Sequence, residues 1–315
     1  MKRSLSQILT SAVYLYTVLF LISPAALAER GAITDEHRDF LKLFYFHRPE
    51  LKIDYEFHTE VDEEDGSGSV SQQVWGIEVD VPVFVSGDTF YTWGAGYQSR
   101  RFDFSASGRE ASLSGEGNFQ QAFFRAGIGH FFSRDLFFSG HIQPGILSNF
   151  GDGFDQEALA LYAEGVFAYR LNPGAQLIAG LRFSEDFDDS PIFPLLGVRL
   201  QESTGKFHIS LTAPLNFTFS YHLDRNSFLY LLGNIEGFRY AVDADSISDT
   251  FDAQFHQRKI GIGAERWITS NITLGLELGA TIESELQLKS DDVGEFRSGE
   301  LEQGFYVQVK LTGSF

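Results

Sequence analysis

Apolar and polar residues alternate with a period of two along most of this chain. In the segment 51–62, Leu51, Ile53 and Tyr55 alternate with charged side chains, and from Phe305 the same alternation runs to the last residue, Phe315. Successive side chains of a strand point to opposite faces, so each such segment predicts a strand with one apolar and one polar face. The pattern therefore predicts an all-β protein.

The predicted strands number about fourteen. Pro214 interrupts the segment 206–223, and because proline cannot donate to a strand ladder, this segment is divided into two short strands. Twelve strands remain the alternative if 185–223 is partly irregular. The predicted strands are 51–62, 70–85, 89–104, 118–132, 136–148, 156–171, 175–185, 192–202, 206–213, 215–223, 227–242, 255–268, 272–283 and 303–315.

The connections between these strands alternate in length. Short turns fall near Ser86, Ser133, Asn172, Ser203, Asp224 and Thr269, and longer, mostly acidic connections span 63–69, 105–117, 149–155, 185–191, 243–254 and 284–302. Transmembrane β-barrels have short turns on one side of the membrane and longer loops on the other. The short turns at one end and the long loops at the other predict a closed antiparallel transmembrane barrel over residues 51–315.

The N-terminus has the layout of a cleaved export signal. Lys2 and Arg3 precede an apolar run over 8–22, and small residues ending at Ala28 follow it. We place cleavage after Ala28, which makes residues 1–28 the signal peptide. Segment 29–50 has apolar residues at helical spacing. It is interpreted as a periplasmic segment, either a short helix at the rim, a plug in the lumen or a loosely ordered leader.

The terminal Phe315 resembles the signal that the barrel-assembly machinery of bacterial outer membranes reads. Together with the alternation and the sorted loops, it makes residues 51–315 similar to the uncharacterised outer-membrane barrel families classed as domains of unknown function. The resemblance implies a place in the bacterial cell outer membrane. It also implies contact with outer-membrane lipid and lipopolysaccharide, and the assembly machinery as a partner during biogenesis. It transfers no functional residue.

Composition narrows the classes of partner. The formal net charge is −19, and no basic stripe is present to neutralise phosphates, which argues against nucleic acid. Cysteine is absent, which excludes a disulfide framework. The 32 phenylalanines suit strands with lipid-facing rings, and those beside the short turns, such as Phe131 and Phe132, are expected to form the periplasmic aromatic girdle.

The polar faces supply the candidate chemistry of the lumen. Charges of both signs are nearly balanced there, which favours a cross-linked interior over a selectivity ring of one sign. Paired glycines on these faces, such as Gly261 and Gly263, are expected to let the wall curve and to seat large lumen side chains. The candidate lumen-lining residues are Glu56, His58, Arg125, His141, Glu164, Arg182, Arg199, His208, Glu236, Glu277 and Lys310.

Barrel size sets the functional prediction. About 8 strands enclose a filled core and about 16–18 an open channel, so fourteen predict a narrow or partly plugged passage. We therefore expect a structural barrel or a narrow passive channel for small solutes. No cofactor is expected. A metal site is not expected either, because the histidines are scattered and the acidic loops lack a calcium-loop spacing.

The alternative is an outer-membrane enzyme that acts on lipid or peptide at the outer rim. The candidate pairs are His130 with Ser133, His208 with Ser210, and His141 with Gln143. The first lies at a periplasmic turn. Residues two apart on one strand are about 7 Å apart, too far for a direct hydrogen bond. No catalytic constellation is therefore assigned.

Overall fold

The computed structural model describes residues 49–62, 68–106, 115–148, 158–184, 192–214, 216–243, 250–290 and 294–315. The predicted signal peptide, residues 29–48 of the predicted segment 29–50, and most of the long acidic connections lie outside these residues. The strands are β1 (Glu50–Asp62), β2 (Gly68–Phe84), β3 (Thr89–Ala106), β4 (Gly115–Phe131), β5 (Leu136–Ser148), β6 (Leu159–Asn172), β7 (Ala175–Ser184), β8 (Ile192–Gln201), β9 (Phe207–Ala213), β10 (Asn216–His222), β11 (Ser227–Asp243), β12 (Thr250–Trp267), β13 (Ile272–Ser290), β14 (Gly294–Leu301) and β15 (Gly304–Ser314).

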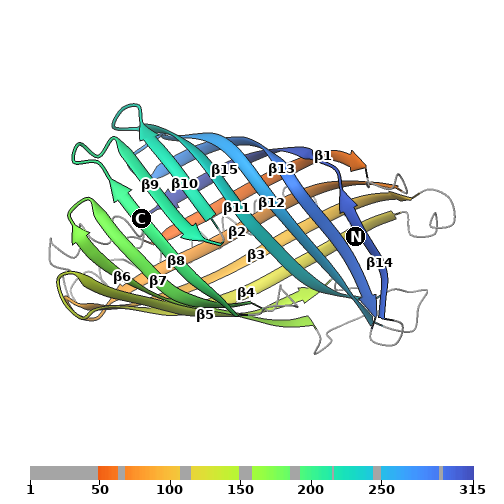
Figure 1. The fold of residues 1–315 in the computed structure, drawn as a ribbon, viewed down its shortest axis with the longest axis horizontal. Coiled ribbons are helices and arrows are strands. Elements are labelled where there is room, and N and C mark those ends of the chain that lie inside the picture. Colours follow the sequence, from red (N-terminus) through yellow and green to blue (C-terminus); the bar gives the residue numbers. More distant parts are fainter. Residues whose placement is uncertain are drawn as a thin grey trace.

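These strands form one antiparallel sheet that closes into a barrel (Figure 1). From β1 to β13 each strand pairs with its neighbour in sequence, and β15 closes the ring by pairing with both β13 and β1. The strand β14 pairs with the far end of β13, beyond β15, so fourteen strands go around the barrel. The predicted fourteen-stranded barrel is confirmed, including the break at Pro214 that separates β9 from β10.

The interpretation of 284–302 as a long loop is wrong. The strand β13 continues to Ser290 and pairs with β14, beginning with Ser284 opposite Leu301. Past the membrane, both faces of a hairpin can be polar. The period-two apolar signal therefore fades there although the backbone ladder persists.

The outer face of the barrel is apolar around its circumference. Large exposed side chains occur on strands far apart in the ring, for example Leu196, Ile262 and Phe305, which are 64%, 62% and 69% exposed. A closed wall leaves no unpaired strand edge, and an apolar exterior is stable only against lipid. No helix among the described residues is long and apolar enough to cross a membrane.

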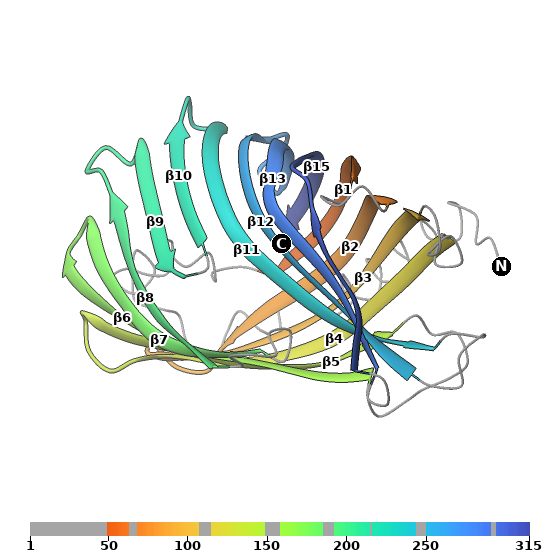
Figure 2. The same cartoon turned by 45° about the vertical axis from the view of Figure 1, so that its right-hand side comes forward.

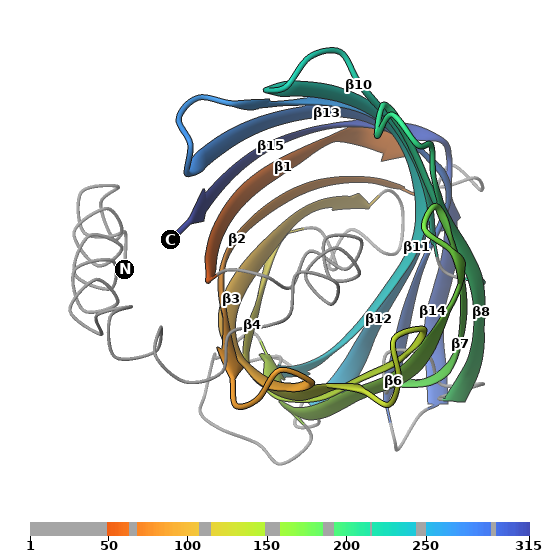
Figure 3. The same ribbon diagram turned by 90° about the vertical axis from the view of Figure 1, so that its left-hand side faces the viewer.

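The wall has two unequal ends. The strands β6 to β10 are 7 to 14 residues long, and the ladder from β10 to β11 ends at Asn216 opposite Asn234. Farther from the short turns, β11 meets β5 directly, with Ala241 paired to Ser148. Figure 2 shows β5 and β11 converging beyond the ends of β6 to β10, and Figure 3 looks into the ring from the end with the short turns. The barrel therefore narrows toward its long-loop end.

The aromatic girdle differs from the prediction. Phe132 is 59% exposed on the outer face, but its neighbour Phe131 is 5% exposed, and Phe90 and Phe137 are 2% and 0% exposed. Adjacent residues of a strand point to opposite faces, so only one ring of each pair can reach the membrane. The other ring packs on the inner face, where the Phe131 and Phe137 centroids lie 4.6 Å apart.

Glycines on the inner face seat large rings, as the sequence predicted. A Cβ at Gly263 would collide with the Tyr230 ring, and one at Gly261 or Gly279 would collide with Tyr306. These two tyrosines lie flat against the wall only because glycine occupies the facing positions. Their hydroxyls are thereby directed along the wall toward Glu277.

Candidate lumen site

The inner wall carries a belt of ion pairs and hydrogen bonds, here called the charged belt. Its most buried part joins β1, β11 and β12. The Lys259 ammonium lies 2.7 Å from Glu56 Oε1 and 2.9 Å from Glu236 Oε2. The His58 Nε2 atom lies 2.5 Å from the same Glu56 oxygen. The Lys259 and Glu56 side chains are only 5% and 6% exposed, so this pair is shielded from water.

Glu277 on β13 extends the belt. Its carboxylate accepts hydrogen bonds from Tyr230 (2.9 Å) and Tyr306 (2.7 Å) and lies 2.8 Å from the Lys310 ammonium. The Tyr306 ring stacks on His58, with the centroids 5.6 Å apart. This ring therefore links the Glu277 group to the Glu56 group.

A second part of the belt lies on β2, β4 and β5, and Arg125 on β4 is at its centre. Its guanidinium donates to Glu78 (2.6 Å), Asp80 (3.1 Å) and Gln143 (2.9 Å). Lys52 lies 3.8 Å from Asp80. The Arg125 side chain reaches residues on both β2 and β5. It can cross β3 because the residue paired with it on that strand is Gly94, which has no side chain.

The belt continues onto β5, β6 and β7 through residues directly opposite one another. His141 pairs with Glu164, and Glu164 pairs with Arg182. The Arg182 guanidinium donates to Glu164 at 2.6 Å, and Tyr162 donates to the same oxygen at 2.9 Å. Opposite charges at directly facing positions stabilise neighbouring strands. The strand register thus brings together residues that lie 18 to 41 positions apart in the sequence.

Two candidate residues lie apart from these groups. Arg199 and His208 are on β8 and β9, where they face Ser210 and Gln201. The His208 Nε2 atom is buried and has no hydrogen-bond partner among the described residues. The terminal Phe315, predicted to be an assembly signal, lies at the short-turn end, where its amide donates to the Pro49 carbonyl at 3.1 Å.

The candidate catalytic pair at the short turn is not assembled. His130 Nδ1 lies 2.8 Å from Thr89 Oγ1. The Ser133 hydroxyl instead accepts from the backbone amides of Asp135 and Leu136, which fixes the turn. Within the described ranges, no group of three or more His, Cys, Asp or Glu is arranged to hold a metal ion.

Sequence reasoning missed the neutral members of the belt. Tyr162, Tyr230, Tyr306 and Gln257 each donate to a belt carboxylate. Tyr230 lies near a short turn, where outward girdle rings were expected, yet it is 7% exposed and faces inward. The alternation of faces along each strand could have identified them, because each of these four residues lies on the inward, polar face of its strand.

An aromatic cluster fills the narrow end of the barrel. We call it the outer cluster, and each of its side chains is at most 7% exposed. Phe255 lies 5.3 Å from both Phe102 and Phe238, centroid to centroid, and the Arg100 guanidinium stacks 3.5 Å from the Phe238 ring. Its members are Val70, Phe102, Phe119, Leu147, Phe238, Tyr240, Phe255 and Leu301.

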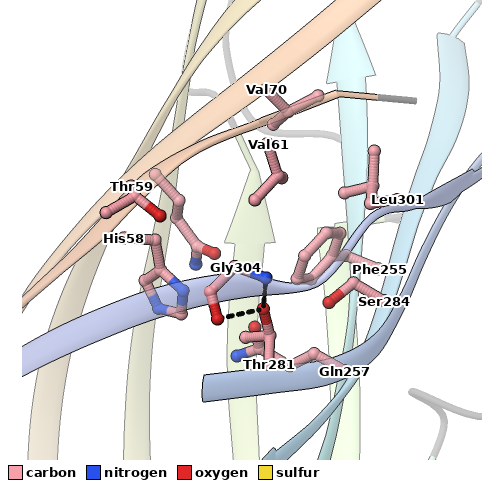
Figure 4. A pocket seen from close by; sticks show the side chains of 11 residues that line it. His58, Thr59, Val61, Val70, Phe255, Gln257, Thr281, Ser284, Leu301 and Gly304 are labelled. Atoms are coloured by element: carbon pink, nitrogen blue, oxygen red, sulfur yellow. Dashed lines mark hydrogen bonds between the residues drawn. The ribbon is translucent and has the colours of Figure 1, made fainter. Parts of the chain in front are cut away.

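A small cavity lies between the outer cluster and the charged belt (Figure 4). Its volume is about 20 Å³, room for one water-sized group. Phe255 and Leu301 line one part, and His58, Gln257 and Thr281 line another. In Figure 4 the valines, Phe255 and Leu301 lie at the top and right of the cavity, with Ser284 beside Phe255, and His58 and Thr281 lie at the left and below. On β11 and β12 the inner wall therefore passes from charged to apolar within a few residues, from Glu236 to Phe238 and from Lys259 to Phe255.

Comparison with known proteins places the chain by architecture. No curated protein matches it. An outer membrane channel from Pseudomonas putida F1 matches with a TM-score of 0.48 and 9% identity, covering 85% of this chain and 96% of that one. The P. putida toluene transporter TodX matches with a TM-score of 0.41 and 10% identity, covering 90% and 93%. The translocator domain of autotransporter NalP from Neisseria meningitidis matches with a TM-score of 0.39 and 10% identity, covering 89% of this chain and 96% of that one.

These likenesses concern architecture alone, since an autotransporter domain scores about as well as a toluene transporter. The closed wall and the apolar exterior by themselves identify a transmembrane β-barrel of the outer-membrane type. The family model described as "Domain of unknown function (DUF6268)" matches residues 123–312. That match spans more than half of the chain, which therefore belongs to this family.

Proposed function

We propose that this barrel is a narrow passive channel for small polar solutes, closed at its long-loop end by the outer cluster. The observation that carries the proposal is the change of lining along the axis. A fourteen-stranded, charged inner wall lies toward the short turns, and a tightly packed aromatic cluster lies where β5 meets β11.

The lining supports small polar solutes over large or apolar ones. The belt sets five cations against six carboxylates at distances of 2.6–3.8 Å, so the wall presents no large excess of either sign. The cations are Lys52, Arg125, Arg182, Lys259 and Lys310, and the carboxylates are those of Glu56, Glu78, Asp80, Glu164, Glu236 and Glu277. A wall of this kind offers hydrogen-bonding groups to a neutral or zwitterionic solute. It does not repel the positive or the negative group of a zwitterion. Nothing in the described site favours catalysis.

Single-channel recording in planar bilayers tests the proposal. Replacing Phe238 by alanine removes a ring that packs on Phe255 and Tyr240, so we expect about a tenfold rise in open time or conductance over the wild type. The milder Phe238→Leu provides a second reading if the alanine variant folds poorly. Phe124→Ala is the matched control, because that ring is 47% exposed on the outer face.

A wild type that is mostly closed, together with a conducting Phe238 variant, supports the proposal. Equal conductance in wild type, both Phe238 variants and the control would show that the outer cluster is no barrier. Absence of conductance in every folded variant at any voltage would remove the channel function itself.

A further inference from the structure

The outer wall contains an apolar groove that is separate from the lumen. It has a volume of about 760 Å³ and crosses β3 to β8. The pairing register places its principal side chains on the outer face, among them Ile142, Leu181 and Ile192, which are 54%, 59% and 61% exposed. The inner face of the same strands carries the His141–Glu164–Arg182 part of the charged belt, so the two sites lie on opposite sides of one wall.

Small residues form the floor of this groove. Gly140 and Gly165 are directly paired across β5 and β6, and Ala126 and Ala163 occupy the adjacent row. Two facing glycines leave a stretch of wall without side chains of its own, and the Phe138 ring lies over part of it. The next strands on either side carry large residues at these levels, with Trp93 opposite Ala126 and Leu181 opposite Gly165. The groove thus results from small residues on β4 to β6 that are flanked by large residues on the neighbouring strands.

The groove begins in the half of the membrane nearer the short turns and extends past the midplane. At its nearer end, Trp93 is four residues past the start of β3 and Gly140 is four past the start of β5; at its farther end, Gly165 is seven residues before the end of β6 and Ile192 is nine before the end of β8. A tilted strand gains roughly 2.5 Å of height per residue, which puts the nearer end about 10 Å and the farther end about 17–22 Å from the turns. The short turns of such barrels face the periplasm, so the nearer end opens into the periplasmic leaflet, where the lipid is phospholipid.

We propose that this groove binds one acyl chain of a phospholipid from the periplasmic leaflet. The groove is continuous with the lipid-facing surface, so acyl chains are the molecules already in contact with its rims. A second copy of the barrel is a poorer occupant, because two hollowed surfaces related by a twofold axis would meet hollow against hollow. A flexible chain can follow the floor formed by the small residues and lie against the surrounding rings.

The driving force is dispersion, because lipid and groove are equally apolar and no hydrophobic transfer is gained. A groove left open to disordered chains loses contacts along its floor, whereas an ordered chain recovers them. The site should therefore keep its chain when bulk lipid is diluted by mild detergent. A Cβ at Gly165 would lie 3.5 Å from the Phe138 ring, an ordinary contact, so a leucine there starts without a clash and extends into the groove.

Native mass spectrometry of the full barrel, purified from outer membranes in mild detergent, tests the site by counting retained phospholipids. We expect wild type to retain about one phospholipid, and Gly165→Leu to retain about tenfold less. Ala264→Leu is the matched control: it places the same leucine side chain on the outer face of β12, away from the groove. Heat modifiability on a gel shows whether each variant is folded.

A second readout follows Trp93 fluorescence with phosphatidylcholine brominated on its acyl chains as the quencher. With Trp75 and Trp267 changed to phenylalanine, quenching of Trp93 should saturate near one brominated lipid per barrel, and Gly165→Leu should abolish the saturation. Equal phospholipid retention in wild type and Gly165→Leu would overturn the proposal. Retention of lipopolysaccharide instead would overturn the assignment to the periplasmic leaflet. None of these outcomes depends on whether the lumen conducts.

Discussion

Replacing Lys259 by methionine tests whether the charged belt is buried in protein or bathed in lumen water. The side chain keeps its approximate length, but the ammonium that lies 2.7 Å from Glu56 and 2.9 Å from Glu236 is lost. Both carboxylates then remain without their closest cation, and Lys259 and Glu56 are only 5% and 6% exposed.

The size of the loss follows from that burial. Removing one partner of a buried ion pair costs about 3–5 kcal/mol, because the remaining charge stays in a poorly solvated place. The neighbouring Arg258 provides the control. It forms an ion pair with Glu283 in which the side chains are 57% and 58% exposed, and such pairs contribute about 0–1 kcal/mol. The two substitutions are adjacent in sequence but lie on opposite faces of β12.

Equilibrium unfolding in urea from phospholipid vesicles measures both changes. We expect the midpoint of Lys259→Met to fall strongly at an unchanged slope, and that of Arg258→Met to shift little. Adding Glu56→Gln to Lys259→Met should restore part of the loss, since one uncompensated charge is then removed. If Lys259→Met were within about 1 kcal/mol of Arg258→Met, the belt would be solvated and the inferred narrow interior would be wrong.

Three further predictions concern the wall, assembly and processing. Gly263→Ala should destabilise the barrel by about 1–3 kcal/mol in the same urea assay, because its Cβ collides with the Tyr230 ring, whereas Gly313→Ala, whose nearest neighbour is 4.0 Å away, should be nearly neutral. Replacing Phe315 by serine should lower the amount of folded, heat-modifiable protein in the outer membrane without impairing refolding of the purified chain; equal amounts in cells would show that Phe315 is no assembly signal. Intact-mass analysis of the mature protein should give a chain beginning at Glu29, and any other start would move the predicted cleavage site.

The sequence by itself determined the class of fold, the number of strands in the ring and the face on which each residue lies. Those features depend only on a period of two, on turn lengths and on Pro214, all of which are local. Parity also supplied the predicted lumen residues, from Glu56 on the first strand to Lys310 on the last. The sequence interpretation was wrong in two places: the girdle was inferred from nearness to a turn, as for Phe131, and the hairpin of β13 and β14 was read as a loop because its apolar alternation fades.

Only the tertiary structure decided which inward residues meet. The contact of Lys259 with Glu56 joins residues 203 positions apart, and it depends on the register of every strand between them around the ring. The barrel narrows where Ala241 contacts Ser148, and there Phe102 packs against Phe255. Both features depend on how far the strands β6 to β10 reach toward the long-loop end. The groove likewise required Gly140 to be paired with Gly165. Register and strand reach are properties of the closed sheet as a whole, and no local pattern encodes them.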